Sequence, residues 1–156
     1  MNNVITIEFF DKSEFPPGQW HKEPDLCFWY HKLPCLAVRD MSMGIWKAFV
    51  GVEEEHSLYE KTIDYIIGIP QALELFRCAY GGLTGAGRLS AKYQNYAKNC
   101  WWIGMEASQG SDLMPLLKLD RADPEVAKVV ANQTYKDLHF IRREANKLAN
   151  FLVKIT

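Results

Sequence analysis

The sequence predicts a single α+β domain spanning residues 1–156, in which an antiparallel β-meander packs against a long C-terminal amphipathic helix. Three observations carry this prediction. Short apolar and aromatic segments separated by turns fill the first third of the chain, apolar residues recur every three or four positions at its end, and 48% of the residues are hydrophobic. A chain of 156 residues can bury such a core without a metal ion or a disulfide.

The first third predicts four strands. In residues 4–10, Ile5, Ile7 and Phe9 alternate with other side chains and share one face. Further strands are predicted over 26–31, 35–39 and 45–52, rich in aromatic and β-branched residues. Residues 32–34 are expected to form a turn, because Pro34 has no N–H to donate to a central ladder. The short connections predict antiparallel neighbours.

The middle of the chain is less regular. Residues 58–67 fit a helical turn or an extended segment equally well. Ile69-Pro70 predicts the entry of a short helix, since proline is well tolerated in a first turn. A glycine-rich loop follows at 80–87, and a strand carrying Trp101 and Trp102 is predicted over 100–107.

Two helices are predicted near the C-terminus. Asp123 is expected to cap a helix that starts at Pro124 and turns Val126, Val129 and Val130 inward. Residues 134–137 resemble a capping box for a final helix of about five turns. Its apolar stripe is Leu138, Ile141, Ala145, Leu148 and Leu152.

Charge and composition exclude several function classes. The net charge is −1, with −5 in residues 1–60 and +4 in the remainder, so we expect no direct nucleic-acid binding. No apolar run is long enough for a membrane span, and the first residues have no signal-peptide pattern, which favours a cytoplasmic protein. The four cysteines and four histidines lack ligand spacing, so we expect no metal site and no cofactor.

The glycine-rich loop is the first candidate site. It contains Tyr80, Gly81, Gly82 and Thr84, but Arg88 follows Gly87, so the P-loop pattern fails. A looser nest of backbone N–H groups for an anion, with Arg88 nearby, is one reading. The other is a turn at which two chain segments pass closely.

The strand with the tryptophan pair is the second candidate. Its side chains alternate, so one tryptophan is expected in the core and the other half-exposed, where it would stack on a ligand or a partner. Trp102, Glu106, Gln109 and Asp112 would line a site with the glycine-rich loop. The two carboxylates would act as acid and base or hold a cation, or they are simply solvated.

Acidic residues of the first 60 positions form a third candidate, a face for a basic partner surface. Its residues are Trp20, Glu23, Asp25, Glu53, Glu54 and Glu55.

The chain also resembles a largely uncharacterised family of small proteins encoded by bacteriophages and prophages. The resemblance rests on WHKEPD at 20–25, LPCLAVR at 33–39, FVGV at 49–52, YGGLT at 80–84, WWIGME at 101–106 and YKDL at 135–138, spread over about 120 residues. The family pattern has His, Asp and His where this chain has Tyr80, Glu106 and Gln109. The resemblance implies phage origin and action in a bacterial cytoplasm, and the three changes favour binding over catalysis.

Two function hypotheses follow. The first is a phage accessory protein that binds and inhibits a host defence component, of the anti-CRISPR or anti-defence type. The alternative is a nucleotide-sequestering or other small-molecule-binding protein, or a hydrolase, with its site between the loops at 80–87 and 106–112. The second requires the two loops to converge around a hollow.

Overall fold

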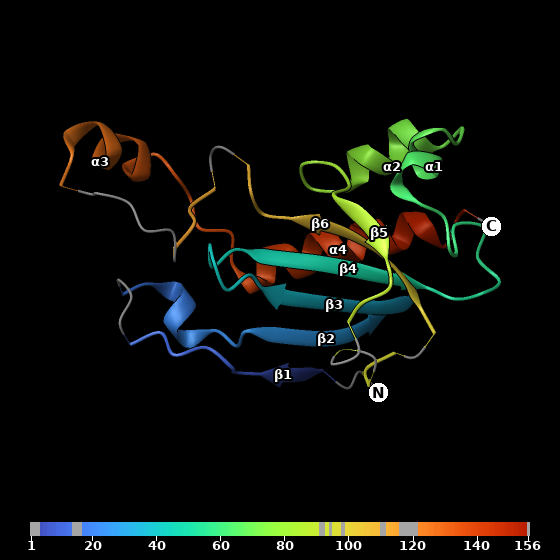
Figure 1. Ribbon diagram of the computed structural model, residues 1–156, viewed down its shortest axis with the longest axis horizontal. Helices are drawn as coiled ribbons and strands as arrows, with labels where there is room; N and C mark the ends of the chain where they lie inside the picture. Colours follow the sequence, from blue (N-terminus) through green and yellow to red (C-terminus); the bar gives the residue numbers. More distant parts are fainter. Residues whose placement is uncertain are drawn as a thin grey trace.

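A computed structural model describes residues 4–13, 17–90, 93, 95–97, 99–109, 112–115 and 122–155 and shows the expected α+β single domain (Figure 1). Six strands form one antiparallel sheet in the order β1-β2-β3-β4-β6-β5. The strands are β1 (Ile5–Ile7), β2 (Leu26–His31), β3 (Leu33–Arg39), β4 (Trp46–Val52), β5 (Gly85–Gly87) and β6 (Trp101–Glu106). The helices are α1 (Ile63–Ile67), α2 (Ala72–Cys78), α3 (Pro124–Ala131) and α4 (Leu138–Leu152), with a 3-10 turn η1 at Gln19–Lys22.

The predicted meander is β2-β3-β4, and its first hairpin is tighter than expected. Lys32, with a φ of 64°, lies between the two strands, and Pro34 is part of β3 rather than of the turn. Pro34 pairs with Tyr30 of β2 but precedes Cys35, the first β3 residue in register with β4. A proline is tolerated there because the β3–β4 pairing begins only at Cys35, so the ladder does not depend on an N–H at position 34.

Helix α4 covers the β3 and β4 side of the sheet and carries the predicted apolar stripe, with Ile141, Ala145, Leu148 and Leu152 fully buried. Its cap differs from the prediction. The carboxylate of Asp137 accepts the N–H of Phe140 at 2.8 Å, whereas Thr134 forms a parallel β-bridge with Asp112. Within the described part of the chain, no helix has the length and apolar character needed to cross a bilayer.

The opposite face of the sheet carries a smaller apolar cluster. Because strand side chains alternate, Trp101 packs against the core on the α4 side and Trp102 lies in this second cluster. Tyr96 stacks on Phe28 there, with the ring centroids 5.4 Å apart. The cluster consists of Leu26, Phe28, Leu36, Cys100 and Trp102. Much of the aromatic content therefore fills the two layers.

Both ends of the sheet differ from the prediction. β1 is three residues long instead of seven, because the N–H groups of Phe9 and Phe10 bond to the Asp25 carboxylate rather than to a strand. The second half of the glycine-rich loop is strand β5, which pairs with β6. Just before β5, the Thr84 N–H donates to the Gly104 carbonyl of β6.

Residues 58–67, for which the sequence left two readings, contain α1. The Thr62 hydroxyl accepts the Tyr65 N–H at 3.2 Å and so caps this helix. Ile66 of α1 and Leu75 of α2 are fully buried in the main core. The outward sides of both helices keep Ile67 and Leu73 exposed.

Helix α3 begins as predicted, with Asp123 accepting the N–H of Glu125 and Pro124 in the first turn. The expectation that its valines face the core is wrong. No residue of α3 is buried, and the helix projects from the body of the molecule (Figure 1).

Candidate functional site

The two candidate loops converge at one hydrogen-bonded contact. The Tyr80 hydroxyl donates to Oδ1 of Asp112 at 2.6 Å, and the Gln109 N–H donates to Oδ2 at 2.8 Å. Lys136 Nζ lies 3.4 Å from Oδ1. We call Tyr80, Gln109, Asp112 and Lys136 the loop junction. It joins the segment after α2, the segment after β6 and the segment before α4.

Packing around the loop junction is close. The ring of Phe140 meets the ring of Tyr80 edge-on at 4.9 Å, and Lys136 Nζ lies 5.6 Å from the Phe140 centroid. Gly81 has a φ of 69°, and a Cβ on it would lie 2.1 Å from Nε2 of Gln109. Glycine is required here because the chain turns through the left-handed region with the Gln109 amide against it.

The Asp112 carboxylate is not presented to solvent. Its residue is 0% exposed, and both oxygens accept hydrogen bonds. Glu106 belongs to a different set of contacts: its carboxylate accepts from the Ser108 hydroxyl at 3.1 Å and lies 3.9 Å from Lys47 Nζ. The arrangement therefore cross-links the loops. Among the described residues, no group of three or more histidine, cysteine or acidic side chains is placed to hold a metal ion.

Three other candidates lie apart from the loop junction. Trp102 is 4% exposed within the second cluster, so the expectation that it stacks on a ligand is wrong. Arg88 donates to Glu60 at 2.6 Å and to the Tyr59 hydroxyl at 3.2 Å. Thr84 is exposed, next to β5, and Gly82 supplies a second positive φ to the turn.

Asp25 is a buried anchor and not part of an acidic surface. Its Oδ1 lies 2.9 Å from both Lys12 Nζ and Arg39 Nε, and its Oδ2 accepts the N–H groups of Phe9 and Phe10 at 3.0 Å. Burial opposes the charge, but the bonds from Lys12, Phe9 and Arg39 outweigh burial and lower the pKa of Asp25.

Arg39 extends this network to α4. Its guanidinium donates to the Gly44 carbonyl at 2.7 Å and to the Tyr135 hydroxyl at 3.0 Å, and it lies over the Trp46 ring. Tyr135 donates in turn to Glu23, whose other oxygen accepts the Leu138 N–H at 2.7 Å. Burial raises the pKa of Tyr135. We call Lys12, Glu23, Asp25, Arg39 and Tyr135 the N-terminal polar network.

Trp20 packs against the N-terminal polar network. It is buried, and its ring meets Tyr135 edge-on at 5.3 Å. The prediction of an exposed acidic face is therefore wrong for Trp20, Glu23 and Asp25, because they tie the N-terminal segment to the start of α4. One feature of the sequence could have predicted this burial. Arg39 is the only charged residue of the otherwise apolar segment 33–39, and a charge buried in such a strand requires a partner of opposite charge.

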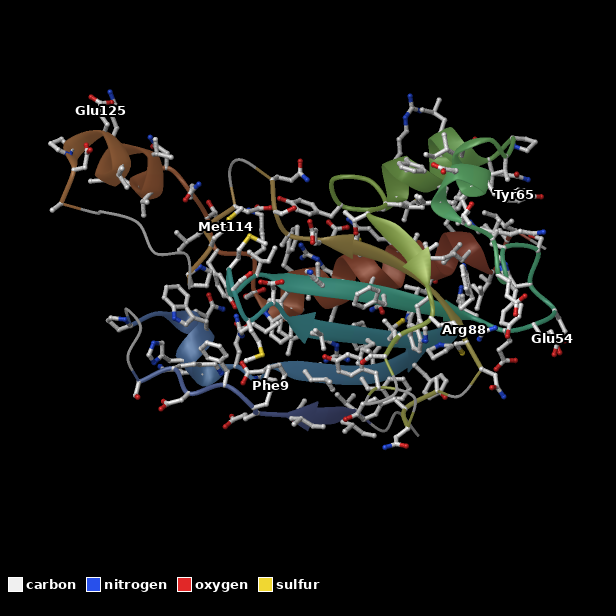
Figure 2. The ribbon with its side chains drawn as sticks, viewed as in Figure 1. Phe9, Glu54, Tyr65, Arg88, Met114 and Glu125 are labelled. Carbon is white, nitrogen blue, oxygen red and sulfur yellow. The ribbon has the colours of Figure 1, made fainter. Side chains whose placement is uncertain are left out.

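The other half of the predicted acidic face is exposed. Glu53, Glu54 and Glu55 form a turn directly after β4, which we call the acidic turn, and Glu54 points away from the body of the molecule (Figure 2). The turn is held at the C-terminal end of α4, because His56 Nε2 lies 2.7 Å from the Leu152 carbonyl and Nδ1 accepts the Leu58 N–H.

A shallow hollow of about 370 Å³ adjoins the acidic turn. Its lining combines charge with apolar surface, and Tyr30 contributes a ring that is 54% exposed. The residues are Tyr30, Lys32, Leu33, Pro34, Glu53, Glu55, His56 and Val153. Tyr30 was not among the candidates from the sequence. The alternation of side chains along a strand does not show which end of the strand is left exposed by the rest of the fold.

No protein-family model, no curated protein and no solved structure matches the chain.

Proposed function

We propose that this chain is a phage-encoded accessory protein that acts in the bacterial cytoplasm by binding and inhibiting a host defence component, of the anti-CRISPR or anti-defence type. The proposal rests on surface chemistry. The acidic turn and the Tyr30 hollow offer solvent-facing binding groups, while the carboxylates of Asp25 and Asp112 are engaged inside the fold.

The single observation that carries the proposal is that an exposed tyrosine ring shares a hollow with Glu53 and Glu55 of the exposed acidic turn. Carboxylates attract lysine and arginine, and a tyrosine ring packs on their aliphatic stems or on a guanidinium plane. Tyrosine is also enriched among the residues that dominate binding energy at interfaces. The target surface is accordingly a basic segment or groove with some apolar character.

Electrostatic attraction of this kind raises the rate of association and is screened by salt. Glu53 is close enough to act on a neighbouring group, since burial and the Glu53 charge both raise the pKa of the Cys100 thiol.

The experiment is a plaque assay in bacterial hosts that carry defined defence systems, CRISPR systems among them. Expression of the chain is expected to restore plaque formation against one system. The triple change Glu53→Gln, Glu54→Gln and Glu55→Gln should abolish this effect, whereas the control Glu8→Gln, Asp64→Asn and Glu74→Gln removes three exposed charges elsewhere and should leave it intact.

Capture from lysates of the responding host then identifies the partner. We expect one protein or complex at stoichiometric yield, retained by the control variant and lost with the acidic-turn variant or at high salt. Rescue against no defence system, together with no stoichiometric capture, would overturn the proposal.

A second candidate, small-molecule or nucleotide binding or hydrolysis between the loops, is favoured by their convergence at Tyr80 and Asp112. Against it stands the occupancy of both Asp112 oxygens. Calorimetric titration with nucleotides distinguishes small-molecule binding from the host-inhibition proposal. Saturable binding that Gln109→Ala and Lys136→Ala weaken, with unchanged binding by the acidic-turn variant, would support the alternative.

A further inference from the structure

Helix α3 has no cover among the described residues. It contains no buried residue and makes no substantial contact with any other described helix or strand. Val129 is 59% exposed, and Val126 and Val130 are half-buried beside it. These three positions share one side of the helix, opposite Lys128.

An eight-residue helix of this composition needs a surface to pack on. Isolated helices shorter than about 12–15 residues are marginal in water, and valine is a poor helix former because its branched side chain loses rotamer freedom. The cap at Asp123 and the proline in the first turn satisfy the helix start but supply no packing.

A second apolar surface, which no described residue covers, lies on the outer side of α1 and α2. A hollow of about 610 Å³ opens there, beside Leu73, which is 65% exposed, and Ile67, which is 56% exposed. Every residue lining it is apolar: Ile67, Ile69, Pro70, Ala72, Leu73 and Phe76. Such a patch marks an interaction site rather than ordinary surface.

The two surfaces lie at opposite ends of one edge of the molecule. Figure 1 shows α3 and the α1–α2 pair projecting on the same side of the sheet, and Figure 2 shows Glu125 at one end of this edge and Tyr65 at the other. A two-fold axis passing between them brings α3 of each copy onto the α1–α2 surface of the other. One set of contacts is then made twice.

We propose that the protein forms a symmetric dimer in which α3 of each chain docks in the Leu73 hollow of its partner. A second copy is favoured over another protein because the chain itself supplies both halves of the contact, and an exposed acidic residue on α3 matches an exposed basic residue on α2. The dimer goes beyond the proposed host-inhibition function and does not depend on it, since the acidic turn takes no part in this contact.

Charge placement gives the contact an orientation. Glu125 lies four residues before Val129 on α3, and Arg77 lies four residues after Leu73 on α2, so each charge neighbours the apolar residue on its own helix. Both are exposed, and neither belongs to an ion pair within the described part of the chain. Val129 against Leu73 in an antiparallel crossing places Glu125 beside Arg77.

Sedimentation of the whole chain across the micromolar range tests the proposal. The wild type is expected to sediment at about 36 kDa, twice the 18.0 kDa of one chain. Val129→Asp and Leu73→Asp should each give monomers with wild-type circular dichroism. Glu125→Arg and Arg77→Glu should each weaken the dimer at least tenfold, and the double charge exchange should restore most of the affinity.

A mixing experiment shows which chains touch. A Val129→Cys chain mixed with a Leu73→Cys chain should give a bismaleimide-linked species at twice the monomer mass, well above the amount from either variant alone. A monomeric wild type, a dimer that survives both aspartate variants, or no rescue by the charge exchange would each overturn the proposal. Loss of dimer with unchanged plaque rescue would leave the host-inhibition proposal standing, so the two fail separately.

Discussion

The hydroxyl of Tyr80 lies 2.6 Å from Oδ1 of Asp112, and this bond joins two loops that are 32 residues apart in sequence. Asp112 in turn forms a β-bridge with Thr134 and lies 3.4 Å from Lys136, so three chain segments meet on one carboxylate. Asp112, a residue type often found in catalytic sites, therefore holds three segments of the fold together. This distinction between chemical type and structural role can be tested directly.

Tyr80→Phe should destabilise the protein without changing its fold. The change removes one donor to a buried charged acceptor, a bond worth about 1.5–3 kcal/mol, and leaves the ring on Phe140 in place. The free energy of unfolding in denaturant measures the loss. Tyr65→Phe, at an exposed ring, is the control and should have little effect; equal stability of Tyr80→Phe and wild type would show that this hydroxyl does not hold the loops.

Gly81→Ala and Gly85→Ala form a matched pair. Gly81 has a φ of 69° and lies against the Gln109 amide, so an alanine there should cost about 1–2 kcal/mol. A Cβ on Gly85 meets no atom within 4 Å, and that variant should stay within about 0.5 kcal/mol of wild type. Thermal and denaturant unfolding of both variants checks the difference, and equal losses would contradict it.

Asp25→Asn should be the most damaging single change at the N-terminal polar network. It leaves the Arg39 guanidinium and the Lys12 ammonium buried with less compensating charge, for which about 3–5 kcal/mol is expected. Glu54→Gln, at an exposed carboxylate, should unfold like wild type. A loss below about 1 kcal/mol, the size typical of a surface pair, would show that Asp25 is not the centre of the network.

Asp40 predicts a specific acid sensitivity. Burial opposes its ionisation, but hydrogen bonds from Ser42, Met43 and Lys47 prevail and lower the pKa of Asp40 from 3.8 to about 2. Because the folded pKa is below the unfolded one, the contribution is complete above about pH 4 and is lost as the pH falls towards 2. The wild type should exceed Asp40→Asn in stability by at most about 2 kcal/mol at neutral pH.

Unfolding free energies of the two proteins across this acid range provide the measurement. The difference between them should shrink as the pH falls, and a constant difference from pH 7 to pH 2 would contradict the assignment. Measurements should be repeated at high salt, which screens the Lys47 pair more than the backbone N–H bonds of Ser42 and Met43.

Local pattern was sufficient for most of the architecture. The aromatic and β-branched segments at β2, β3 and β4 and the three-to-four spacing along α4 correctly predicted a meander packed against a terminal helix. The pattern was insufficient for α3, where an apolar stripe correctly implied a helix but wrongly implied a covered one. Apolar periodicity shows which face of a helix is apolar. It does not show whether that face is buried against another part of the same chain.

For the candidate site, residue type was a poor guide to exposure. Trp20, Glu23 and Asp25 were grouped with Glu53, Glu54 and Glu55 by charge and aromatic character, yet only the last three face solvent. The difference lies in partners remote in sequence: Arg39 and Tyr135 close around Glu23 and Asp25, whereas the described contacts provide the acidic turn with no cation.

Strand alternation, helix spacing and the Asp123 cap are encoded within a few neighbouring residues, and backbone stereochemistry makes them readable before any folding is considered. The burial of Asp25 and Asp112 and the partial burial of Glu23 arise only when segments 14 to 112 residues apart come together. The exposure of Tyr30 and of α3 is likewise decided by the tertiary structure, because the described residues do not pack over them. A charge is stabilised or left free according to which distant donors reach it, and that depends on the packing of the entire chain.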